Sequence, residues 1–256
     1  MIKNPNDIEM PLIEHLKELQ KRFIRALIAA TIGAIVCFVI HEEIWQFLVA
    51  PLIEALDKTQ KGSLAVLGLL EGIITKLKVA GISGVLLASP IISYQIWAFV
   101  APALYETERK FILPLAFAST FLFLLGVSFG YGVIFQYVFP FLLEQSPENV
   151  QATLSIEDYL NTALKLLLGF GCTFQLPVVA FFLARGGFVD HKDMLHFFRY
   201  AIVGIFVLSA FLTPPDPLSQ ILMAIPLTLL YGVGVIIAWI FTTKGKSDFD
   251  EEEIGD

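Results

Sequence analysis

The sequence predicts an all-α protein that crosses a lipid bilayer six times, and three observations support this fold class. Hydrophobic residues make up 56% of the 256 residues and charged residues only 16%, against about 25% charged in soluble domains. Six separate apolar segments have the character of membrane-spanning helices, which need about 20 residues to cross the hydrocarbon. The alternating pattern of membrane β-strands is absent from the sequence. We therefore expect lipid to surround most of this chain.

The six expected spans are unequal in length. They cover residues 22–41, 76–98, 111–135, 159–183, 200–213 and 218–241. The fifth has fourteen residues between Arg199 and the helix breaker TPPDP, a rise of only about 21 Å. Either protein shields this helix or the bilayer thins around it, unless Arg199 reaches the interface and the helix begins earlier. Pro226 removes one backbone hydrogen bond from the sixth span and is expected to kink it.

The segments outside the spans complete the domain plan. Residues 1–21 form an amphipathic segment ahead of the six-helix domain at 22–241, and residues 242–256 form an acidic tail. Six carboxylates in the last nine residues predict that this tail is disordered. Without the tail the chain is close to neutral, so its charge does not indicate binding to nucleic acid. The loop at 42–75 carries apolar residues at helical spacing, which predicts a helix near the membrane interface.

The basic residues predict that both termini face the cytoplasm. Twelve lysines and arginines flank the spans on the side of the termini, and four lie on the other side. Such an excess marks the cytoplasmic side of a membrane protein. The remaining basic residue, Lys165, lies near the outer end of the fourth span, where its long side chain can reach the interface.

The sequence contains no set of residues that indicates catalysis. The motifs HExxH, Walker A and GxSxG are absent, as is any metal-ligand spacing, so we expect no enzyme, cofactor or metal. Cys37 and Cys172 lie in apolar segments, where cysteine acts as a small hydrophobic residue. Gln175 lies deep in the fourth span, shortly before Pro177. Its amide can form a hydrogen bond with a neighbouring helix of this chain or of a partner.

The segment at residues 12–25 is the most polar part of the predicted membrane region. Helical spacing pairs Glu18 with Arg22 one turn later and places His15 on the same face as Glu18. The simplest interpretation is a self-paired amphipathic helix with its basic residues near lipid headgroups. The loop at 101–110 contributes Glu108 on the same side of the membrane. Two segments therefore present carboxylates at one surface.

Five motifs, in order along the chain, carry a family resemblance. They are PLIEHLKEL near the start, APLIEAL after the first span, SPIISYQIWAFVAPALYETERK through the second, FQLPVV in the fourth, and LTPPDPLSQILMAIPL across the fifth and sixth. Together they resemble TatC, the family of receptor subunits of the twin-arginine protein translocase. The resemblance implies that the chain is the non-enzymatic core subunit of a translocase in the bacterial cytoplasmic (inner) membrane. This translocase exports folded proteins. It also implies that spans five and six are short and that transport uses the proton motive force.

The resemblance further implies where cargo binds. TatC-like proteins bind signal peptides whose paired arginines meet carboxylates on the cytoplasmic side. A guanidinium group presents a planar set of donors that a carboxylate accepts through two parallel hydrogen bonds. The matching carboxylates here are Glu18 and Glu108, and His15 and Leu16 are expected to shape the same surface.

The family also uses single-span partners, TatA and TatB, and we expect self-association in the complex. The matching positions for partner contact are Gln175 and Pro51. Three positions depart from the family pattern: Gln20 replaces a common arginine, whereas Gln175 and Gly232 replace common glutamates. Gln175 can still form hydrogen bonds but carries no charge, and Gly232 has no side chain that could contact a partner. The alternative function is a six-span transporter of a small solute, whose inverted repeat and midplane charges are weak or absent here.

Overall fold

Six helices are long and apolar enough to cross a membrane, as the sequence predicts. The computed structural model describes residues 12–59, 62–100, 112–145, 153–213 and 217–253. The spans within these residues are Ile13–Val39, Glu71–Val100, Ile112–Glu144, Ile156–Arg185, His191–Leu212 and Ser219–Phe241. The predicted six-span, all-α class is therefore confirmed.

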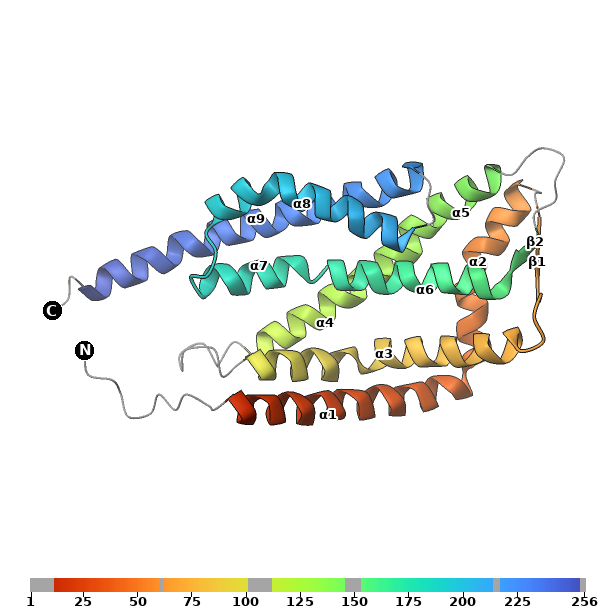
Figure 1. Cartoon of the computed structure of the whole chain (residues 1–256), viewed down its shortest axis with the longest axis horizontal. Helices are drawn as coiled ribbons and strands as arrows, with labels where there is room; N and C mark the ends of the chain where they lie inside the picture. Colours follow the sequence, from red (N-terminus) through yellow and green to blue (C-terminus); the bar gives the residue numbers. More distant parts are fainter. Residues whose placement is uncertain (1–11, 60–61, 101–111, 146–152, 214–216, 254–256) are drawn as a thin grey trace.

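Most of the helices lie roughly parallel along the long axis of the molecule (Figure 1). Helices α1 (Leu12–Val39) and α3 (Glu71–Val100) lie along one edge, and α8 (His191–Leu212) and α9 (Pro217–Glu253) along the other. Between them run α6 (Ile156–Thr173) and α7 (Leu176–Arg185), while α4 (Ile112–Phe129) and α5 (Phe135–Glu144) follow a diagonal path. The start of α1 and the end of α9 share one end of the molecule, which we call the proximal end. The opposite end is the distal end.

The fifth span differs most from its prediction. Helix α8 begins at His191, nine residues before the expected start at Tyr200, so the predicted length of fourteen residues is wrong. A capping box formed by Asp190 and Asp193 starts the helix within a polar segment. The helix then continues through Arg199 into the apolar segment. Among the described residues, spans five and six remain the two shortest, with 22 and 23 residues against 27 to 33 for the others.

Two spans contain irregular turns. In the third, α4 passes through a π-helical turn at Gly130–Ile134 into α5, so the span ends at Glu144 and not near residue 135. The fourth is divided into α6 and α7 around Gln175, because Pro177 lies in the first turn of α7 and has no backbone N–H. In the sixth, α9 is continuous through Pro226 and its backbone remains helical to Glu253. This helix includes most of the segment in which the sequence predicts disorder.

A small parallel sheet joins the two distal loops, and the sequence does not predict it. Strand β1 (Ser63–Ala65) pairs with β2 (Thr153–Ser155), with Ser63 opposite Thr153. The Glu71 carboxylate, only 3% exposed, lies beside this junction. Its Oε2 accepts from the backbone N–H groups of Leu67 (2.5 Å) and Gly68 (2.8 Å), and its Oε1 accepts from Ser155 Oγ (2.7 Å) and the Glu157 N–H (2.8 Å). Glu71 therefore ties the start of α3 to the start of α6.

Replacing Glu71 with glutamine should loosen the distal junction. The amide NH₂ group would face donors where a carboxylate oxygen now accepts, and at least one buried donor would lose its partner. We expect the unfolding temperature to fall by several degrees and amide exchange at Glu157 to accelerate. Glu54→Gln is the matched control, because Glu54 is exposed and forms an ion pair with Lys58, and exposed pairs contribute little. Equal effects of both substitutions would contradict this role.

Helix α2 (His41–Thr59) confirms the helix predicted in the first long loop. Its buried face, formed by Leu48, Val49, Leu52 and Ala55, packs into the main core rather than only against the membrane interface. Phe135, Leu160 and other fully buried side chains of α5 and α6 form the centre of that core. The core therefore lies toward the distal end.

Pro51 has a role inside the chain that its sequence position does not reveal. A proline at this position of α2 has no N–H to donate to the carbonyl of Phe47, four residues earlier. The hydroxyl of Tyr131 donates to that carbonyl instead, at 2.6 Å, and the Tyr131 ring stacks on Phe47 with 4.2 Å between centroids. Pro51 therefore leaves the Phe47 carbonyl free to accept from Tyr131, and this hydrogen bond holds α2 against the third span.

Tyr131→Phe should reduce the free energy of unfolding by about 1 kcal/mol, because the Phe47 carbonyl would lose its partner. In a Pro51→Ala background the alanine N–H can satisfy the same carbonyl, so the loss should be smaller. A double-mutant cycle in denaturant measures this coupling. Independent, additive effects of the two substitutions would show that Tyr131 does not compensate for Pro51.

Candidate functional site

The predicted recognition segment is the first half of α1, and it lies against the end of α3. The ring of His15 stacks on the ring of Phe99, with 4.5 Å between centroids and 21° between planes. Phe99 precedes Val100, the last residue of α3, so this contact fixes the start of α1 beside the exit of the second span. This contact positions the segment of α1 that carries Glu18, and the role of His15 in shaping a binding surface stays a prediction.

Glu18 is held by an ion pair along the helix. Arg22 donates to Glu18 Oε1 from both Nε (2.9 Å) and Nη2 (2.6 Å), and each side chain is 22% exposed. Within the part of the chain that the structure describes, the second oxygen, Oε2, accepts no hydrogen bond. The carboxylate is thus fixed in orientation, partly shielded from water, and still has acceptor capacity.

Basic side chains surround this carboxylate. Lys17, Lys21, Arg22 and Arg25 line a hollow of about 370 Å³ together with Glu18. Leu16, predicted to belong to the same surface, is 56% exposed. Gln20 is exposed as well.

The second predicted carboxylate, Glu108, lies in the segment 101–111, outside the described residues. The two residues that flank this segment, Val100 and Ile112, both pack against a cluster that contains Trp97 and Val178. The Trp97 indole N–H donates to Ser119 Oγ at 2.7 Å, which fixes α3 against α4. The two ends of the segment are therefore anchored at a common point.

Gln175 forms its hydrogen bond within the chain. Its Nε2 donates to the carbonyl of Ser119 on α4 at 2.9 Å, at the break between α6 and α7. This is the own-chain alternative of the two that the sequence leaves open. At Gly232 of α9, a Cβ would meet nothing within 4 Å, so the missing side chain leaves open space there.

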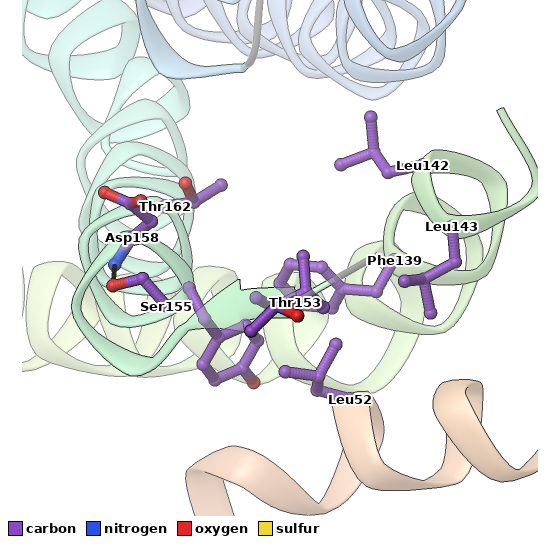
Figure 2. Close-up of a pocket in the computed structure, with 10 residues that line it drawn as sticks. Leu52, Phe139, Leu142, Leu143, Thr153, Ser155, Asp158 and Thr162 are labelled. Carbon is purple, nitrogen blue, oxygen red and sulfur yellow. Dashed lines mark hydrogen bonds between the residues drawn. The ribbon is translucent and has the colours of Figure 1, made fainter. Parts of the chain in front are cut away.

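A second concave region, which the sequence does not reveal, lies at the distal end. Figure 2 shows Leu52 of α2 and Phe139, Leu142 and Leu143 of α5 across an open space from Asp158 and Thr162 of α6. The pocket holds about 240 Å³. Its walls come from α2 and from the consecutive elements α5, β2 and α6, so the pocket forms only where α2 packs against the later part of the chain.

The described geometry defines a class of protein. It is a polytopic helical membrane protein whose proximal end displays an oriented carboxylate among cations. Among its described residues, no group of three or more His, Cys, Asp or Glu could hold a metal ion. Such a surface suits recognition of a charged ligand.

Comparisons with known proteins identify the family. The family Sec-independent protein translocase protein (TatC) matches residues 14–226, and the chain belongs to it. A TatC of Desulforapulum autotrophicum is 43% identical, over 95% of this chain and 88% of that protein. A TatC of Escherichia coli K12 is 36% identical, over 93% of this chain and 91% of that protein. A crystal structure of the twin-arginine translocase receptor TatC is 34% identical, has a TM-score of 0.78 and covers 88% of this chain and 97% of that chain.

Family membership settles the general function. The chain is a non-enzymatic, multi-pass membrane component of twin-arginine protein transport, in a translocase complex with other Tat subunits. The alternative of a small-solute transporter is not supported by these relatives. These relatives do not support a catalytic activity either.

Proposed function

We propose that the chain binds twin-arginine signal peptides of folded precursors at its proximal end and nucleates the translocation complex there. The observation that carries this proposal is Glu18, oriented by Arg22 through one oxygen while the other oxygen has acceptor capacity. An incoming guanidinium group finds a partly desolvated acceptor whose position is already fixed. Charge-assisted hydrogen bonds of this kind are among the strongest that side chains form.

Glu108 is the proposed second carboxylate for the paired arginines. Its support is indirect and comes from the ends of its segment. Val100 adjoins Phe99, which stacks on His15 at the start of α1, and Ile112 packs in the same cluster as Val100. The segment that carries Glu108 therefore starts and ends near the helix that carries Glu18. His15 and Leu16 complete the proposed surface.

The partners of the proposed complex are single-span subunits of the TatA and TatB type, together with further copies of this chain. Gln175 and Pro51 are the proposed contact positions. Within the chain, Gln175 Nε2 donates to the Ser119 carbonyl, and Pro51 leaves the Phe47 carbonyl to accept from Tyr131. The proximal end is proposed to face the cytoplasm of a bacterial inner membrane. The excess of basic residues on the side of the termini supports this orientation.

A pair of precursors tests the proposed function. Membranes that contain the full chain are solubilised and incubated with a tagged folded precursor that carries a twin-arginine signal peptide, or its twin-lysine version. Lysine keeps the charge but lacks the planar set of donors, so we expect several-fold lower recovery of the chain with the twin-lysine precursor. Equal recovery with both precursors would contradict the proposal.

A further inference from the structure

An apolar groove between α1 and α3 lies beside the proposed signal-peptide site but is not part of it. Phe23, Leu27 and Ala30 line it from α1, and Ile92, Ile96 and Phe99 line it from α3. The groove holds about 380 Å³, and the two helices that line it lie side by side along one edge of the molecule (Figure 1). Both helices are membrane spans, and Phe23, Leu27 and Ile96 are more than half exposed, so the groove is open to the hydrocarbon.

The proximal end of the groove meets the basic hollow around Glu18. Arg22 lines both, so the apolar and the basic regions are continuous. Lys17, Lys21 and Arg25 are exposed, and no carboxylate of the described residues lies within ion-pair distance of any of them. Within the described part of the chain, Arg22 donates from Nε and Nη2 to Glu18, and its other N–H groups donate to no acceptor there.

This arrangement matches one kind of molecule. An anionic phospholipid has an acyl chain for the groove and a phosphate for the cations at its end, and basic pockets between membrane helices bind such headgroups. Photolabelling distinguishes a lipid in this groove from the alternative occupant, a signal peptide. We propose that the α1–α3 groove holds one acyl chain of an anionic phospholipid whose phosphate binds Lys21, Arg22 and Arg25. This site shares Arg22 with the proposed signal-peptide site, but lipid binding is measured without peptide, so it can fail or succeed separately from the proposed function.

Lipid titrations of the purified full chain test the headgroup part. Binding of phosphatidylglycerol and phosphatidylcholine with equal acyl chains is measured by native mass spectrometry. We expect at least a tenfold preference for phosphatidylglycerol, which falls below about twofold in a Lys21→Gln/Arg25→Gln variant. Lys192→Gln is the control, since Lys192 is an exposed lysine of α8 that does not line the groove. Equal binding of both lipids, or a preference that survives the double substitution, would overturn the proposal.

A photoreactive acyl chain tests the groove itself. Phosphatidylglycerol with a diazirine in its acyl chain should label residues of α1 and α3 that line the groove, such as Leu27 or Ile96. Ala30→Leu fills the groove without changing charge and should reduce that labelling several-fold; if this variant does not fold, the site of labelling in the unmodified chain still decides. Labelling spread over other helices would contradict the assignment. Loss of labelling on adding a twin-arginine signal peptide, with crosslinks from the peptide to the groove instead, would assign the groove to the peptide.

Discussion

Replacing Glu18 with alanine is expected to weaken crosslinking to a twin-arginine signal peptide by about ten- to a hundredfold. This range follows from the value of a hydrogen bond to a charged group, about 1.5–3 kcal/mol. The substitution removes the oriented acceptor and also leaves Arg22 without its partner, so a cation remains where the peptide arginine should bind. Photocrosslinking of a labelled signal peptide to membranes that contain each variant measures the effect.

Glu14→Ala is the matched control for this prediction. Glu14 lies one turn earlier on α1, is exposed, and has no ion pair among the described residues. It removes the same charge from the same helix, so nonspecific attraction falls equally in both variants. Glu108→Ala should weaken crosslinking as Glu18→Ala does. Unchanged crosslinking in both Glu18 and Glu108 variants, with normal membrane insertion, would contradict the assigned site.

Gly84→Leu should destabilise the protein by about 3 kcal/mol, near the upper end of the cost of overpacking. Gly84 of α3 crosses Gly33 of α1 at backbone contact. A Cβ on Gly84 would lie 2.3 Å from the Ala34 nitrogen, and one on Gly33 would lie 2.6 Å from the Gly84 carbonyl oxygen. Backbone atoms cannot move aside as a flexible side chain can, so the two helices must separate. Small residues permit this close approach of membrane helices.

Gly81→Ala supplies the comparison within the same helix. A Cβ at Gly81 would meet nothing within 4 Å, and alanine is the better helix former by up to about 1 kcal/mol. Thermal unfolding in one detergent should therefore show a large loss for Gly84→Leu and none for Gly81→Ala. Because His15 lies on α1, the Gly84 variant should also bind signal peptide less well. A Gly84 variant as stable as the unmodified chain would show that the crossing is looser than the structure indicates.

The sequence predicts the number of spans well because apolar length is a property of each segment alone. It misplaces the start of α8 because charge marks the edge of the membrane, whereas a helix continues past that edge for as long as its backbone is satisfied. The polar segment from His191 to Arg199 is helical because Asp190 caps its start and satisfies its backbone. The β1–β2 pair could not be predicted, because three-residue strands have no pattern and the contact of Glu71 with Ser155 joins residues 84 positions apart.

The candidate site also has some contacts that the sequence predicts and others that it does not. The Glu18–Arg22 pair follows from i, i+4 spacing and is confirmed. The contact of His15 with Phe99 and the bond from Gln175 to Ser119 join residues more than fifty positions apart, so only the packing of the helices reveals them. The groove between α1 and α3 likewise exists only once the two helices are placed together. The role of Glu108 stays a prediction.

The most direct test of the central claim is the coupling between Glu18 and the arginines of the signal peptide. Affinities of the purified full chain and of its Glu18→Ala variant are measured for a twin-arginine peptide and for its twin-lysine version. If Glu18 recognises the guanidinium group, the preference for arginine should be several-fold in the unmodified chain and largely lost in the variant. A variant that binds both peptides more weakly but keeps the full preference for arginine would contradict the account.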